Sequence, residues 1–206
     1  PIITLWYNSF MQYTNPNIEC FPFYKSNDLG KTLYDVVLKY KPKKIIEFGP
    51  LNGYTTVAMA MALDELKTCK IISYDLFEDY QYKHSTIKNT QKNIDSYGLS
   101  RYVKLKKKDF NEWLKNPEDF DLLYIDLSNT GEIIEKFYGA VKNQIDNGSI
   151  VVFEGGSEER DNVEWMNKYN KKKVGGTKVP YKVINWKFPS LSMIVKKWKT
   201  CRIKEF

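Results

Sequence analysis

Short apolar runs, most of which close on an acidic residue, recur along the chain at regular intervals. Runs of this length and composition are typical of strands buried in a parallel sheet. They lie at 44–48, 70–75, 102–107, 120–126 and 149–154. Stretches with a helical pattern separate them, at 28–40, 55–67, 84–97, 111–115 and 131–142. Strands that alternate with helices predict an α/β domain built on a parallel sheet.

Two later runs, 181–187 and 191–197, are joined only by Phe188-Pro189-Ser190. So short a connection predicts an antiparallel hairpin. A helix that follows the segment 155–161 and reaches about Tyr169 is expected before it. The predicted fold class is therefore α/β: a doubly wound, mostly parallel seven-stranded sheet with helices on both faces and a C-terminal antiparallel hairpin.

The first expected helix has a start and a stop signal. Asp28 is the expected N-cap, and Pro42 ends the helix. Residues 1–27 show no clear period, but their aromatic content argues against a disordered tail. We expect this segment to pack on the core or to cover the site, with a dimer contact as a third alternative; residues 28–206 form the single main domain. Its aromatic residues are Trp6, Tyr7, Phe10, Tyr13, Phe21, Phe23 and Tyr24.

The loop after the first expected strand is the strongest motif in the chain. It reads Glu47-Phe48-Gly49-Pro50-Leu51-Asn52-Gly53-Tyr54-Thr55 and leads directly into a helix. Helix N-termini bind ligands through unpaired N–H groups. A phosphate-binding loop has four residues between its glycines and then a lysine, whereas here three intervene and Tyr54 follows. A dinucleotide-binding loop needs glycine where Leu51 and Tyr54 stand. Both interpretations are disfavoured.

The spacing E-x-G-x-x-x-G-Y-[ST] in this loop resembles the first motif of class I (Rossmann-like) S-adenosyl-L-methionine (SAM) methyltransferases. It is most similar to the small O-methyltransferase branch. The resemblance covers roughly residues 28–198 and implies SAM as the cofactor. A purely structural glycine turn is the alternative at this point.

Five expected strands end in or next to an acidic residue: Glu47, Asp75, Asp109, Asp126 and Glu154. Ligands of open α/β sheets bind beyond the carboxyl ends of the strands, so these acids are expected to share one site. Asp75 lies 22 residues after Gly53, which fits an acid that binds ribose hydroxyls.

The resemblance also implies that Asp109 and Phe110 bracket the adenine ring, although Asp109 could simply cap the helix that follows. The expected cofactor-binding residues are Glu47, Gly49, Gly53, Tyr54, Thr55, Asp75, Asp109, Phe110 and Asp126.

Candidates for catalysis are Asp126, Glu154 and Arg160. Methyl transfer mainly requires that donor and acceptor be positioned, and an oxygen acceptor is helped by a base or a metal. Catechol-type enzymes of the family have a lysine three residues after the fourth-strand acid and Asp-Asn after the fifth strand. Asn129 and Glu154-Gly155 stand there instead. We therefore expect no metal ligands, although Glu154 with Asp126 could still hold Mg²⁺ through water.

The loop 155–161 is the expected substrate-facing segment. Its two glycines let the backbone approach a ligand, and Arg160 can orient polar groups. In the alternative interpretation, Ser157 is only the N-cap of the next helix. His84, the single histidine, is expected on the surface, with a base near the adenosine side as the alternative.

The charge of the chain is unevenly distributed. Residues 165–206 carry eleven Lys and one Arg against Glu205, which is 12 − 1 = +11, so the remainder sums to 20 − 24 = −4. Such a basic end allows nucleic acid, an anionic surface or an acidic small substrate as a partner, although a solvated lysine-rich surface is the favoured explanation. Nucleic acid is not favoured, because Asp126-Leu127-Ser128-Asn129 stands where amine-methylating enzymes carry [DN]-P-P-[FYW].

The predicted function is methyl transfer from SAM to a small polar acceptor, at oxygen and without catechol-type metal catalysis. The alternatives are a nucleic-acid methyltransferase and a non-catalytic SAM-binding domain.

Cysteine usage and composition indicate where the protein is expected to be found in the cell and what kind of protein it is. Cys20, Cys69 and Cys201 are odd in number and lack C-x-x-C spacing, as expected of free thiols in the cytoplasm. With 42% apolar and 28% charged residues the chain is typical of a globular protein. No apolar run approaches the roughly 20 residues that span a membrane.

Overall fold

The computed structural model of the protein describes residues 13–82 and 84–196. The predictions that concern Trp6, Tyr7, Phe10, Cys201 and the basic residues after 196 lie outside these ranges.

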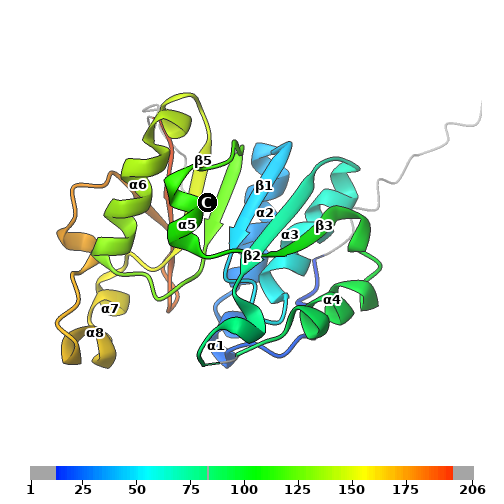
Figure 1. Cartoon of the computed structure of the whole chain (residues 1–206), viewed down its shortest axis with the longest axis horizontal. Coiled ribbons are helices and arrows are strands. Elements are labelled where there is room, and N and C mark those ends of the chain that lie inside the picture. The colour runs from blue at the N-terminus through cyan, green and yellow to red at the C-terminus, as the bar shows by residue number, and fades with distance from the viewer. Residues whose placement is uncertain (1–12, 83, 197–206) are drawn as a thin grey trace, which may run out of the picture.

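The core of the molecule is one seven-stranded sheet with the order β3-β2-β1-β4-β5-β7-β6 (Figure 1). Strands β1 to β5 pair in parallel, whereas β7 pairs antiparallel with both β5 and β6. The predicted fold class is confirmed, including the antiparallel C-terminal pair. The strands are β1 (Lys44–Phe48), β2 (Lys70–Asp75), β3 (Val103–Lys107), β4 (Leu122–Ile125), β5 (Ile150–Glu154), β6 (Lys182–Asn185) and β7 (Leu191–Ile194).

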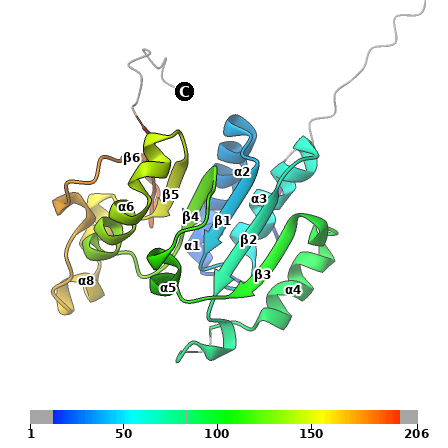
Figure 2. The ribbon, with the colours of Figure 1, turned by 45° about the horizontal axis from the view of Figure 1, so that its top comes forward.

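Helices cover both faces of the sheet (Figure 2). Alternate strand residues point to opposite faces, so Ile45 of β1 joins the apolar cluster with α2, α3 and α4, and Ile46 joins the cluster with α5 and α6. Burial on both faces explains why the strands read as continuous apolar runs. The helices are α1 (Pro22–Ser26), α2 (Leu29–Tyr40), α3 (Tyr54–Leu66), α4 (Ile87–Ser96), α5 (Phe110–Lys115), α6 (Gly131–Asp146), α7 (Glu158–Asp161) and α8 (Glu164–Lys168).

Three predicted helix boundaries need correction. Helix α4 begins three residues later than expected, because the Thr86 hydroxyl accepts a hydrogen bond from Asn89 N at 3.1 Å and caps it there; His84 precedes the helix. Helix α6 continues past the expected end to Asp146. The single helix expected to reach about Tyr169 is two, α7 and α8, because the chain is extended at Val163 (φ −60°, ψ 150°).

The residue predicted to cap α2, Asp28, does not supply the capping hydrogen bond. Asp28 stands at the N-cap position, but its backbone is left-handed (φ 58°) and its carboxylate makes no capping bond. The cap is supplied by Asn27, whose Oδ1 accepts a hydrogen bond from Leu29 N at 2.9 Å. Asp28 instead pairs with Lys187 at 2.5 Å on the surface.

The carboxyl ends of the parallel strands meet at one edge of the sheet, where α1, α7 and α8 also gather (Figure 1). In the described part of the chain, none of the helices combines the length and the apolar character that crossing a membrane requires. The site is built at this carboxyl edge.

Candidate functional site

A pocket of about 1080 Å³ opens at the carboxyl edge of the sheet. Its walls come from the β1–α3 loop, the ends of β2 to β5, the helix α1 and the segment of α7 and α8. Of the five acids predicted to share a site, four line it: Asp75, Asp109, Asp126 and Glu154. The sheet thus brings together residues that are up to 79 positions apart in the sequence (154 − 75).

The β1–α3 loop approaches the end of β4 more closely than any side chain would allow. Gly49 has φ +83°, and a Cβ atom there would lie 1.9 Å from the carbonyl oxygen of Asp126. Gly53, with φ +94°, is the N-cap of α3 and has no side chain to satisfy the N–H groups of the first turn. The loop therefore offers bare backbone toward the pocket, where Gly49 and Thr55 form part of the wall.

Glu47 lies beneath this loop, outside the pocket wall. Its fully buried carboxylate accepts hydrogen bonds from the hydroxyls of Thr55 (2.6 Å), Thr56 (2.6 Å) and Ser73 (2.5 Å). Burial raises the pKa of Glu47, and the three hydroxyls oppose that shift. Its geometry gives Glu47 a structural part, joining β1, β2 and α3; direct cofactor contact stays a prediction for it and for Gly53.

Asp75 and Asp109, the pocket acids at the ends of β2 and β3, differ in their backbone partners. Asp75 accepts a hydrogen bond from Phe77 N at 2.7 Å through Oδ1, and burial raises its pKa. Asp109 caps α5, with Oδ1 accepting from Asn111 N (2.8 Å) and Glu112 N (3.1 Å). The capping interpretation of Asp109 is confirmed, and its contact with adenine stays a prediction.

Two aromatic residues of the predicted cofactor site are fixed by the core. The ring of Phe110 packs edge-on against Phe48, with 5.0 Å between centroids. The Tyr54 hydroxyl has two acceptors for its single proton, the side-chain oxygen of Asn15 (2.8 Å) and the carbonyl oxygen of Tyr24 (3.2 Å). Tyr54 thereby connects the β1–α3 loop to the N-terminal segment.

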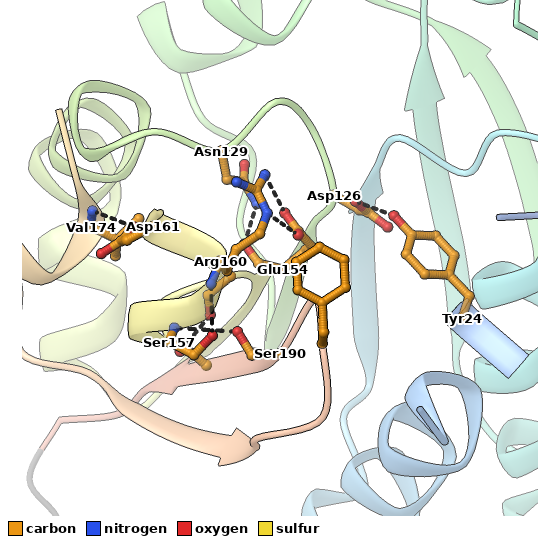
Figure 3. A network of polar contacts seen from close by, with 12 residues as sticks. Tyr24, Asp126, Asn129, Glu154, Ser157, Arg160, Asp161, Val174 and Ser190 are labelled. Atoms are coloured by element: carbon orange, nitrogen blue, oxygen red, sulfur yellow. Dashed lines mark hydrogen bonds and ion pairs between the residues drawn. The ribbon is translucent and has the colours of Figure 1, made fainter. Parts of the chain in front are cut away.

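Asp126 lies at the centre of the site, immediately after β4 (Figure 3). Its two carboxylate oxygens accept hydrogen bonds from two tyrosine hydroxyls, Tyr24 to Oδ1 and Tyr124 to Oδ2, each at 3.1 Å. Sequence reasoning assigned neither tyrosine to the site. For Tyr24 the available signal was the aromatic composition of residues 1–27, which does not say which ring reaches the sheet.

Glu154 and Arg160 form a buried ion pair beside Asp126 (Figure 3). Arg160 donates from Nε to Oε1 (2.5 Å) and from Nη2 to Oε2 (3.1 Å), a bidentate geometry. The Ser157 hydroxyl accepts from Arg160 N at 3.2 Å, so the predicted capping of α7 is confirmed, while Arg160 also lines the pocket. The guanidinium lies 5.2 Å from the ring centroid of Trp165.

The charges of this cluster favour a proton on Asp126 over one on Glu154. Burial raises the pKa of both carboxyls, and repulsion by Glu154 raises that of Asp126 further. Arg160 stabilises the charged form of Glu154. The hydroxyls of Tyr24 and Tyr124 pull the pKa of Asp126 back down. Of the two carboxyls, Asp126 is therefore the one that takes up a proton more readily.

The residues compared with catechol-type metal sites have other partners here. Both oxygens of Glu154 are bound by Arg160. Asn129 donates from Nδ2 to the carbonyl oxygens of Ile125 (3.1 Å) and Glu154 (2.8 Å), which ties the ends of β4 and β5 together. Within 13–82 and 84–196, no three His, Cys, Asp or Glu side chains are grouped as metal ligands would be.

Comparison with known proteins gives a family and a set of similar folds. A family model described as "Methyltransferase domain" matches residues 46–154, just over half of the chain. No curated protein matches the sequence.

Three of the similar solved structures illustrate the likeness. A methyltransferase of Podospora anserina with bound S-adenosylhomocysteine (SAH) has 16% identity and a TM-score of 0.57, over 82% of this chain and 78% of that one. TomG, an O-methyltransferase of Streptomyces achromogenes involved in tomaymycin synthesis, was solved with SAM. It has 14% sequence identity and a TM-score of 0.54, over 88% of this chain and 92% of that one. An O-methyltransferase of Bacillus cereus with bound SAH has 17% sequence identity and a TM-score of 0.54, over 88% of this chain and 84% of that one. At these identities the likeness establishes the fold.

Proposed function

The chain belongs to the methyltransferase domain family, in line with the resemblance noted in its β1–α3 loop, and we propose that it transfers a methyl group from SAM to a small polar acceptor, at oxygen, without catechol-type metal catalysis. SAM or SAH is bound in structures of the same fold from Podospora anserina, Streptomyces achromogenes and Bacillus cereus. The observation that carries the proposal is the pocket in which the glycine loop meets Asp75, Asp109, Asp126 and Glu154.

The pocket residues fit this cofactor. Gly49 and Thr55 provide a wall of backbone and small side chain at the start of α3, which suits close approach of the amino acid part. Asp75 offers a carboxylate for ribose hydroxyls, and Asp109 with Phe110 offers an acceptor and an apolar surface for adenine. When bound, SAM supplies a methyl group already activated by its sulfonium.

An oxygen acceptor is supported by the group at the centre of the site. A hydroxyl must lose its proton when its oxygen is methylated, and a base works best with a pKa near the working pH. We assign this role to Asp126, because its carboxyl lies in the pocket wall between two tyrosine hydroxyls and burial raises its pKa. The Glu154–Arg160 pair is held rigidly beside it and can orient a polar acceptor.

Transfer without catechol-type metal catalysis is supported by the partners of Glu154. A divalent cation would have to compete with the bidentate Arg160 for both oxygens of that carboxylate. Asn129 stands where catechol-type enzymes have a lysine. Its side-chain amide donates hydrogen bonds to the ends of β4 and β5.

A small acceptor is supported by the aromatic walls of the pocket. The N-terminal segment contributes aromatic wall residues, among them Phe21 and Phe23, and α8 contributes Trp165. We take residues 13–27 as part of this wall, beside a main domain of 28–206. In the basic C-terminal third, Lys172 is paired with Glu135 at 2.6 Å, which favours a solvated surface over a nucleic-acid site. The free thiols Cys20 and Cys69 support a cytoplasmic location.

The test is methyl transfer from isotopically labelled SAM to a panel of small hydroxyl compounds, each offered beside its amine analogue, and to a short RNA. We expect label on hydroxyl compounds, unchanged in the presence of EDTA and abolished by Asp126→Asn. Lys142→Gln, an exposed change on α6, is the matched control and keeps the activity. Label on amines or RNA, or loss of transfer with EDTA, would contradict the finer parts of the proposal. SAM binding without transfer to any acceptor favours the non-catalytic alternative.

A further inference from the structure

Tyr24 reaches the centre of the site from a part of the chain outside the family match. It belongs to the short helix α1, yet its hydroxyl bonds to Asp126 Oδ1, 102 residues further along the chain (Figure 3). Asp126 thus depends on a segment that precedes the first strand.

The position of Tyr24 is fixed from several sides. Its ring makes edge contacts with Phe21 and Phe23, with centroid distances of 5.7 and 5.1 Å. Its backbone N donates to the carbonyl oxygen of Phe21 at 2.9 Å, and its own carbonyl oxygen accepts from the Tyr54 hydroxyl at 3.2 Å. A ring held in this way keeps its hydroxyl directed at one carboxylate oxygen.

The groups that face Asp126 act in opposite directions. Glu154 on β5 and Glu47 on β1 repel its negative charge, and burial adds to this effect. The hydroxyls of Tyr24 on α1 and Tyr124 on β4 stabilise the charge. Arg160 on α7 is directed at Glu154 and stabilises that carboxylate in its charged form.

The two tyrosines are not equivalent. Tyr124 is completely buried, whereas Tyr24 forms part of the pocket wall. The Tyr24 hydroxyl therefore joins Asp126 to the N-terminal segment at the wall of the pocket.

We propose that Tyr24 is a positioning residue for the methyl transfer, whose hydroxyl holds the Asp126 carboxylate charged and oriented to receive the proton of the acceptor. This inference rests on the function proposed above. In the step it serves, the acceptor oxygen forms a bond to the methyl carbon, the C–S bond breaks with its electron pair left on sulfur, and the O–H proton passes to Asp126. Asp126 then returns this proton to water when the product leaves.

The first test measures Asp126 itself and needs no acceptor. The carboxyl carbon of Asp126 is titrated by NMR in the protein with bound SAH, in wild type and in Tyr24→Phe, with Asp126→Asn to assign the signal. Removing a hydrogen bond from the charged form raises the pKa, so we expect an increase of about one unit in Tyr24→Phe. Tyr102→Phe is the matched control, because that hydroxyl bonds to the remote Asp64 at 2.8 Å, and it should leave Asp126 unchanged. An unchanged pKa in Tyr24→Phe would overturn the proposal.

The second test uses the pH dependence of methyl transfer with a hydroxyl acceptor found in the screen. The base acts when deprotonated, so the acid limb of kcat/KM should move to higher pH in Tyr24→Phe by the same amount, and activity should recover in alkaline buffer. If Tyr24 had only a structural role, Tyr24→Phe would lower the rate of methyl transfer equally at all pH values. That result would also overturn the proposal.

The proposed function can fail independently of the role of Tyr24: it fails if the wild-type protein does not bind SAH. The titration is then made on the free protein, and it still decides whether Tyr24 holds Asp126 in its charged form.

Discussion

At the scale of single residues, Gly49 is the position that most constrains the site. The loop and the end of β4 touch through backbone alone, since a Cβ at Gly49 would lie 1.9 Å from the carbonyl oxygen of Asp126. This contact sets the distance between the glycine loop and the proposed base. A side chain there must displace one of them.

We therefore predict that Gly49→Ala is far more damaging than the same change at Gly98. Both glycines have positive φ (+83° and +68°), but a Cβ at Gly98 meets nothing within 4 Å. Gly98→Ala should cost only the left-handed backbone term, about 1–2 kcal/mol of unfolding free energy in urea. Gly49→Ala should cost more and should also abolish SAH binding. Equal losses for the two variants would show that the close approach is unimportant.

Much of the site could be predicted at this scale, because its acids lie where apolar runs end. A strand's end can be recognised in the sequence, so Asp75, Asp126 and Glu154 were found without a structure. Tyr24 and Tyr124 could not be found in this way. Their hydroxyls reach Asp126 through side-chain orientation, which leaves no spacing signal.

At the scale of elements, the start of α2 shows how the N-terminal segment is tied to the domain. Asn27 accepts from Leu29 N through Oδ1 and donates from Nδ2 to the carbonyl oxygen of Phe188 at 2.8 Å. Asn185 donates to the carbonyl oxygen of Asn27 at 2.8 Å. The β6–β7 connection and the α1–α2 junction therefore hold each other, close to the pocket wall.

We predict that Asn27→Ala lowers the unfolding free energy by about 2 kcal/mol, because it leaves a buried N–H and a carbonyl oxygen without their partner. The matched change is Asp28→Asn at the adjacent position. It removes only an exposed ion pair with Lys187, so it should cost no more than about 1 kcal/mol. Urea unfolding measures both. If the aspartate change were the costlier one, the cap assigned to Asn27 would be wrong.

The boundaries of elements were less predictable than their order. Alternation of apolar runs and helical patterns identified all five parallel strands, but a cap depends on which side chain turns back to the backbone. Asn27 and Asp28 are adjacent and both are common caps, so the sequence does not distinguish them. The interruption between α7 and α8 likewise has no proline or glycine to mark it.

At the scale of the whole molecule, the order of the strands produces the site. Five parallel strands place their carboxyl ends at one edge, and α1, α7 and α8 lie at that edge (Figure 1). The pocket is thus divided between an acid-lined floor supplied by the sheet and aromatic walls supplied by the helices. The floor follows from topology and was predictable. The sequence also offered the N-terminal segment as a cover of the site, but it did not show which aromatic residues of α1 and α8 form the walls, because that depends on how these helices pack.

The central claim is that this floor binds the adenosyl cofactor of methyl transfer. Calorimetric titration of SAH into the purified protein tests it most directly, with Asp75→Ala as the site variant and Asp79→Ala as the control. Asp79 is a nearby acid on the surface, paired with Lys107 at 3.0 Å.

We predict one SAH bound per chain, an affinity reduced roughly ten- to a hundredfold in Asp75→Ala through lost hydrogen bonds to the charged carboxylate, and no change in Asp79→Ala. Absence of binding heat and of thermal stabilisation of the wild-type protein at millimolar SAH or SAM would contradict the account.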